Sequence, residues 1–172
     1  MKNIIITITI LLSTYATAQV AIGKASFSSN SVSLEFGNEN RGFILPWVTN
    51  TTNVTGAVNG TIVYNTTDKK VYVKYASGWK DLSVDTTGAA DTSLQNPLSD
   101  VASAKVMIGG NPTTDTTPGV LILADTNKAM ILPKVASPHL NIVNPSPGMM
   151  VYDTTAKQLA IFNGTVWSFW KS

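Results

Sequence analysis

The chain has 172 residues, no cysteine, one histidine and a formal net charge of +2 at pH 7. The lack of cysteine excludes disulfides and thiolate metal sites, and the singly scattered basic residues give no indication of nucleic-acid binding. Charged residues make up 13% of the chain, while Thr, Asn, Ser, Val and Gly are abundant, which favours strands and tight turns over long helices.

The amino-terminal segment is typical of a secretory signal peptide. Lys2 precedes an apolar run at residues 4–12, and the small residues Ala16 and Ala18 fit a signal peptidase cleft. The run is well short of the roughly 20 residues that span a bilayer, and no later segment is apolar for long enough. The sequence therefore predicts a signal peptide at 1–18, no transmembrane segment in the mature chain, and export to the cell surface or beyond, with the periplasm as the alternative.

Three sequence blocks occur twice in the same order. The pairs are Ile22-Gly23 and Ile108-Gly109, RGFILPWV (41–48) and KAMILPKV (128–135), and GTIVYNTTDKKVYVKYASGW (60–79) and GMMVYDTTAKQLAIFNGTVW (148–167). The offset between the copies grows by one residue from block to block, as expected when single residues are inserted into a duplicated sequence. We interpret the chain as a tandem duplication.

Each long block predicts a three-stranded antiparallel meander. The expected strands cover 61–64 and 71–75 in the first copy and 149–152 and 159–162 in the second, with third strands beginning at Trp79 and Trp167. Asn65 and Asp153 follow the first strands, and side chains of these types cap their own backbone in hairpin loops. Such a small sheet must be covered on its apolar face, and we expect Ile44 and Ile131 of the ILP segments to cover it.

The predicted fold is all-β, with two tandem small antiparallel β-meander modules joined by a polar linker. The expected divisions are a first β module at 19–83, a linker at 84–105 that is rich in Asp, Thr, Ala and Ser, and a second β module at 106–172. A linker of this length allows the modules either to pack together or to remain separate.

The repeated blocks resemble a module of exported Bacteroidetes-type surface proteins and of phage fibre-like proteins, in which GFLPPRM precedes GxxVYNTTTNKLxxYNGTxW. The matching stretches are RGFILPWV, GTIVYNTTDKK and SGW in the first copy and KAMILPKV, GMMVYDTTAKQ and NGTVW in the second. Both copies read ILP where the module has LPP. The resemblance implies a surface-exposed structural module of fibres, adhesins or large secreted proteins.

The sequence contains little that could support catalysis or metal binding. His139 follows Pro138 in an expected loop, and one histidine without cysteine excludes the common zinc ligand sets. The acidic residues form no calcium loop, and no glycine-rich phosphate loop occurs. We expect no enzymatic activity, no cofactor and no metal site. A glycosidase, with two carboxylates brought together by folding, is the enzymatic alternative.

The aromatic residues are the candidate contacts. Trp79 and Trp167 hold matching positions in the two copies, which favours a role in the core of each module. Trp47 and Trp170 have no tryptophan counterpart in the other copy, so these two residues and Phe169 are the predicted binding residues.

The predicted function is structural or adhesive. We expect contacts with a protein partner or self-association, with a homotrimer as in fibres, and exposed strand edges available for pairing. The alternative is a carbohydrate-binding module, in which the same aromatic residues bind a surface polysaccharide.

Overall fold

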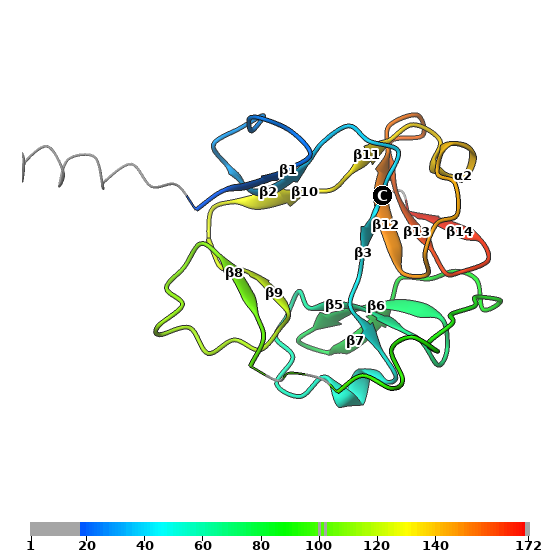
Figure 1. The fold of residues 1–172 in the computed structure, drawn as a ribbon, viewed down its shortest axis with the longest axis horizontal. Helices are drawn as coiled ribbons and strands as arrows, with labels where there is room; N and C mark the ends of the chain where they lie inside the picture. Colours follow the sequence, from blue (N-terminus) through cyan, green and yellow to red (C-terminus); the bar gives the residue numbers. More distant parts are fainter. Residues whose placement is uncertain (1–17, 100, 102, 171–172) are drawn as a thin grey trace, which may run out of the picture.

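The computed structural model describes residues 18–99, 101 and 103–170, so most of the predicted signal peptide lies outside the described residues. Strands β1 to β14 account for nearly all of the regular structure (Figure 1). The exceptions are the 3-10 turn η1 (Thr51–Asn53) and the short helix α2 (Pro138–Asn141). Within the described residues, no helix has the length and apolar character needed to cross a membrane.

Each module contains the expected meander. In the first, β5 (Ile62–Asn65), β6 (Lys70–Tyr75) and β7 (Gly78–Asp81) pair antiparallel. In the second, β12 (Met149–Asp153), β13 (Gln158–Phe162) and β14 (Trp167–Trp170) do the same. Each meander gains a parallel strand at its edge, β4 (Trp47–Val48) on β5 and β11 (Lys134–Val135) on β12. The predicted all-β fold with two repeated modules is confirmed.

The hairpin loops between the first two strands follow the predicted turn chemistry. The Asn65 side-chain oxygen accepts from the Thr67 amide at 2.9 Å, and the Asp153 carboxylate accepts from the Thr155 amide at 2.8 Å. Lys69 and Lys157, which occupy matching loop positions, both have the left-handed φ that closes the loop, at 62° and 54°. The two copies therefore fold into the same local structure.

Two strands cross between the modules and join them. β3 (Phe43–Ile44) of the first copy pairs antiparallel with β12 of the second. β10 (Ala129–Ile131) of the second copy pairs parallel with β2 (Val32–Phe36), which also pairs with β1 (Val20–Ile22). β8 (Val106–Ile108) and β9 (Leu121–Leu123) form a separate parallel pair, at the left of Figure 1. The modules thus pack together.

One hydrophobic core contains side chains from both modules. Leu45, Tyr64 and Val71 of the first module pack with Met150 and Ile161 of the second. A smaller core, around Val135, Val151 and Phe162, belongs to the second module alone. The stability of the first meander therefore depends on the presence of the second.

The structure corrects two details of the sequence-based expectations and adds one contact. Ile44 is 47% exposed and Leu45 is 4% exposed, so Leu45 is the residue of the first ILP segment that covers the meander. Successive side chains point to opposite faces in an extended chain, which is why only one of these two can face the core. His139 lies in helix α2, where a loop was expected. The expected linker also contacts the second module, because the amide of Ala89 donates to the carbonyl of Asn163 at 3.1 Å.

A partly buried ion pair, formed by Glu35 of β2 with Lys24, predicts acid sensitivity. The Glu35 carboxylate lies 2.5 Å from the Lys24 ammonium and accepts from the Ser28 amide at 2.9 Å. These interactions lower the pKa of Glu35 from 4.5 to about 2. Because the unfolded chain binds this proton more readily, the stabilisation by Glu35 is complete above pH 4.5 and is lost as the pH falls to about 2.

Replacement of Glu35 by glutamine should therefore lower the free energy of unfolding at neutral pH, and the difference from the wild type should shrink below pH 4.5. Urea unfolding at a series of pH values measures this difference. Glu39→Gln, at an exposed position, is the matched control and should follow the wild type. A difference between Glu35→Gln and the wild type that stays constant from neutral pH to pH 2 would contradict the prediction.

Candidate functional site

Tyr64 is the central residue of the contact between the two modules. It lies on β5, is 0% exposed, and its hydroxyl donates to the backbone carbonyl of Asn163 at 2.8 Å. Removal from water raises its pKa to about 12, so the hydroxyl stays protonated and able to donate. A polar group inside an apolar core needs such a partner, and here the partner comes from the other module.

Trp47 and Gly148 complete the contact beside Tyr64. The indole nitrogen of Trp47 donates to the carbonyl of Pro147 at 2.9 Å, and the Trp47 ring centroid lies 6.0 Å from that of Tyr64. Gly148 has a left-handed φ of 77°, and a Cβ atom at this position would lie 2.8 Å from the Cβ of Tyr64. The close approach of the modules therefore requires glycine at position 148.

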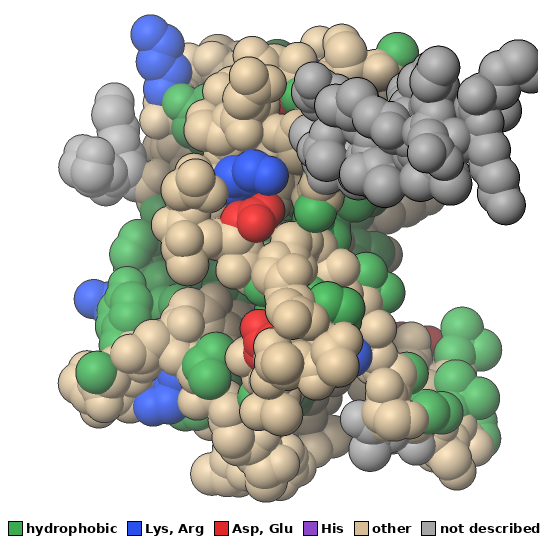
Figure 2. Space-filling model, turned by 90° about the vertical axis from the view of Figure 1, so that its left-hand side faces the viewer, with side chains coloured by type: hydrophobic (Ala, Val, Ile, Leu, Met, Phe, Trp, Pro, Cys, Tyr) green, Lys and Arg blue, Asp and Glu red, His purple; other side chains and the backbone are tan. Residues whose placement is uncertain are grey.

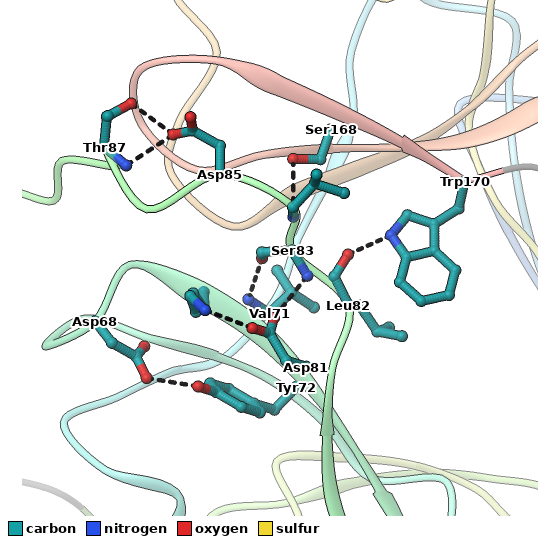
Figure 3. Close-up of polar contacts among 12 residues, drawn as sticks. Asp68, Val71, Tyr72, Asp81, Leu82, Ser83, Asp85, Thr87, Ser168 and Trp170 are labelled. Atoms are coloured by element: carbon teal, nitrogen blue, oxygen red, sulfur yellow. Dashed lines mark hydrogen bonds and ion pairs between the residues drawn. The ribbon is translucent and has the colours of Figure 1, made fainter.

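Trp170 joins the end of the second meander to the chain that leaves the first. Its indole nitrogen donates to the carbonyl of Leu82, and the amide of Val84 donates to the hydroxyl of Ser168 on the same strand at 3.5 Å (Figure 3). Phe169, the residue between them, packs on the second core and meets the ring of His139 edge-on at 5.7 Å. Residues 82–84 thus run along β14.

A polar cluster at the end of the first meander directs this course of the chain (Figure 3). The Asp81 carboxylate accepts from the Ser83 amide at 2.7 Å and pairs with the Lys70 ammonium at 2.6 Å. The Ser83 hydroxyl accepts from the amide of Val71 at 2.8 Å, and Tyr72 donates to Asp68 at 2.6 Å. Burial and the bond to the Asp68 carboxylate raise the pKa of Tyr72, so this hydroxyl remains a donor.

The predicted binding residues are all half-buried against the chain itself. Trp47 and Trp170 pack on the shared core, and Phe169 packs on the second core. The expected core tryptophans, Trp79 and Trp167, are also half-buried; Trp167 packs on the second core, whereas Trp79 belongs to neither of the two described cores. Contact of Trp47, Phe169 and Trp170 with another molecule stays a prediction.

Sequence reasoning did not identify Tyr64 and Gly148 as contact residues. Both occupy repeated positions, with Tyr152 and Gly60 as their counterparts. From the sequence alone, residues at these positions are expected to make contacts only within their own module. The available signal was the repeated Val-Tyr pair, because a tyrosine retained in a β-strand core needs a partner for its hydroxyl. That partner, Asn163, lies about 100 residues away in the chain, and the Trp47–Pro147 bond joins residues with a similar separation. The sequence alone could not locate a partner so far away.

Apart from that of the exposed Glu39, the carboxylates in the described part of the chain have structural partners. Glu35, Asp81 and Asp125 form ion pairs with lysines, and Asp68 accepts from Tyr72. The carboxylates that accept bonds from backbone amides in turns are those of Asp85, Asp91, Asp115 and Asp153. Between residues 18 and 170, leaving out 100 and 102, no group of three metal-ligating side chains occurs.

Several large apolar side chains are exposed at the surface. On the face shown in Figure 2, charged side chains are few, and hydrophobic side chains gather in patches between them. The exposed large apolar residues include Ile22, Val106 and Val120, which lie on or beside the short parallel sheets. An open groove of about 330 Å³ is lined by Met130, Ile131, Leu132, Lys134 and Tyr152. Exposed apolar patches of this kind are typical of surfaces that bind protein.

The sequence matches a family model described as a phage tail like trimerisation region, over residues 21–96 and 109–172. Neither the curated proteins nor the solved structures gave a match. The two matched stretches correspond to the two copies of the repeat. The resemblance to phage fibre-like proteins is thereby supported, while the resemblance to exported Bacteroidetes-type surface proteins stays a prediction. The match covers most of the chain, and the protein belongs to the family of phage tail-like trimerisation regions.

Proposed function

We propose that the protein is a non-enzymatic structural subunit that assembles into a homotrimer and contributes to a fibre or an adhesive assembly. The observation that carries this proposal is the match of both copies to a trimerisation region. The exposed apolar side chains support it, because a self-associating chain buries such groups against its neighbours. The absence of catalytic activity is supported by the engagement of the carboxylates in turns and ion pairs.

The proposed site of action is the cell surface or the extracellular space. Support comes from the first 18 residues, in which Lys2, the apolar run at 4–12 and the small residues Ala16 and Ala18 follow the order of a secretory signal peptide. Detection of a mature amino terminus at Gln19 on protein recovered from outside the cytoplasm would support export. Recovery of the whole chain in the cytoplasm alone would contradict it.

The trimer predicts a defined mass in solution. Light scattering of the purified protein in buffer should give about three times the mass measured in denaturant, and this ratio should hold over a range of concentrations. A monomer at all concentrations would contradict the proposal. Tryptophan fluorescence in the presence of surface polysaccharide is the companion measurement, since a monomer whose fluorescence responds to polysaccharide would indicate a carbohydrate-binding module.

A further inference from the structure

The two modules contact each other through different surfaces. The first module contributes β3, Leu45, Trp47 and Tyr64, whereas the second contributes the start of β12 with Gly148. Because the modules are copies, each also carries the surface that the other uses. The second module has its own version of the tyrosine surface, and the first has its own version of the glycine edge. Each of these remaining surfaces is exposed in part, although Ile62 and Leu132 pack on the shared core and β10 pairs with β2.

The open glycine surface lies at the start of β5, and we call it the Gly60 edge (Gly60, Thr61, Ile62 and Tyr75). Gly148 is buried under Tyr64, whereas Gly60 is exposed, and a Cβ atom at Gly60 would meet nothing within 4 Å. The carbonyl of Gly148 accepts from the amide of Leu45 at 3.1 Å, and no described amide donates to the carbonyl of Gly60.

Burial at the far end of this edge differs in the same way. Tyr75 occupies the position that matches Asn163, the residue whose carbonyl accepts from Tyr64. Asn163 is 1% exposed, whereas Tyr75 is 47% exposed. The edge thus exposes a strand start and the carbonyl of Tyr75, which accepts from the Lys74 ammonium at 3.0 Å within the chain. Docking of a second copy would add a donor to this carbonyl or replace Lys74.

The open tyrosine surface is the apolar groove of the second module, which we call the Tyr152 groove (Met130, Ile131, Leu132, Lys134 and Tyr152). Each of these residues matches one in the first module. The matching residues are Phe43, Ile44, Leu45, Trp47 and Tyr64. Leu45 and Tyr64 are buried by the second module, whereas Leu132 and Tyr152 are half-exposed. Within the chain, β10 pairs with β2 and Leu132 packs on the shared core, and the matching residues Ile44, Leu45 and Trp47 also line an open pocket. The clearest difference between the two copies is therefore at the tyrosine, which the other module buries at position 64 and leaves half-exposed at position 152.

We propose that the Gly60 edge of one copy of the chain docks into the Tyr152 groove of a second copy, so that the contact between the modules is repeated head to tail. This inference rests on the proposed self-association. In the chain, Met149 pairs with Ile44 and Met150 with Phe43. At the matching positions of the repeat, the equivalent pairs are Thr61 with Ile131 and Ile62 with Met130, with the two members of each pair on different chains.

The side chains at the two surfaces fit this pairing. The Tyr152 hydroxyl takes the place of the Tyr64 hydroxyl and donates to the carbonyl of Tyr75 of the next copy. Lys134 takes the place of Trp47, and its ammonium donates to the carbonyl of Asn59, which matches Pro147, while its aliphatic stem covers the strand edge. Head-to-tail contacts of this kind close into a ring when the rotation between copies permits, and a trimer is such a ring.

A second copy of the chain is the occupant favoured by the structure. Pairing of the second module with another second module would require the Gly148 edge, which Tyr64 and Trp47 already cover within the chain. The Gly60 edge is the matching surface that stays accessible among the described residues. The groove and the edge also lie on different modules, so each chain can bind one neighbour on each side.

Cysteine cross-linking of the full-length protein tests this register, because the chain has no cysteine of its own. A double variant, Thr61→Cys with Ile131→Cys, should form covalent dimers and trimers on mild oxidation, because Cα atoms paired across antiparallel strands lie within disulfide reach. The control variant, Ile44→Cys with Met149→Cys, should close its disulfide within one chain and keep the monomer mass on a denaturing gel.

Single variants test the head-to-tail direction. After oxidation, Thr61→Cys alone and Ile131→Cys alone should each run at the mass of a single chain on a denaturing gel. A mixture of the two, unfolded and refolded together, should give covalent dimers. Cross-linking of Thr61→Cys to itself would indicate packing of like modules and would overturn the inference.

Light scattering of the reduced proteins distinguishes a failure of the head-to-tail contact from a failure of the proposed trimer. If the wild type and the double variant are trimers in solution and no covalent species form, the head-to-tail contact is wrong and the proposed trimer stands. If the wild type is a monomer at every concentration, both are wrong. Covalent trimers from a variant with the wild-type mass would support both.

Discussion

Replacement of Tyr64 by alanine is expected to lower the free energy of unfolding by about 3–5 kcal/mol. The side chain is fully buried between the modules and packs with Leu45, Met150 and Ile161, so its removal leaves a cavity in the shared core. The carbonyl of Asn163 also loses one of its two donors and keeps the amide of Ala89. Because the cavity lies at the contact of the modules, the variant should separate them as well as weaken the first meander.

Tyr152→Ala is the matched control for this prediction, because Tyr152 holds the same position in the second copy and is only half-buried. It should lower the free energy of unfolding by clearly less, when both variants are compared in urea at a concentration where the chain is monomeric. Tyr64→Phe should lower it by about 1 kcal/mol, through the lost hydrogen bond alone. Equal effects of Tyr64→Ala and Tyr152→Ala would show that the modules do not pack as described.

Replacement of Gly148 by alanine is expected to lower the free energy of unfolding by about 2–5 kcal/mol. Two effects combine in this estimate: an L-residue at a left-handed φ costs about 1–2 kcal/mol, and overpacking costs about 1–3 kcal/mol. The left-handed φ is 77°, and the added Cβ would lie 2.8 Å from the Cβ of Tyr64 and 2.9 Å from its Cγ. Neither Tyr64 atom can move without displacing β5 from the shared core.

Gly60→Ala separates these two effects. Gly60 has a similar left-handed φ of 89° but has no atom within 4 Å of an added Cβ, so only the conformational effect of about 1–2 kcal/mol applies. Thermal or urea unfolding of the monomeric chain measures both variants. A loss of stability at Gly60 as large as that at Gly148 would mean that the backbone conformation, and not the approach of Tyr64, makes glycine necessary there.

The local structure of each copy was predictable from the sequence. The two meanders, their hairpin loops and the capping roles of Asn65 and Asp153 follow from strand patterning and turn chemistry, which act over a few residues. The duplication supports each predicted element a second time, because both copies carry the same strand and turn pattern. The role of Trp47, Phe169 and Trp170 in binding another molecule stays a prediction, since the described contacts of Trp47 and Trp170 are with the other module of the same chain.

The pairing between modules was not predictable, because the sequence offers each strand two equivalent partners. β3 pairs with β12 of the sister module, yet the start of β5 in its own module has the same chemistry, and local propensity does not distinguish them. The same ambiguity explains why Ile44 was expected inside and Leu45 is found there: the face that is buried depends on which sheet the segment joins. The sequence by itself therefore determined the two repeated β modules, through short-range turns and strand patterns. Tertiary structure alone decided which copy of each surface is buried, because that choice rests on packing between residues far apart in the chain.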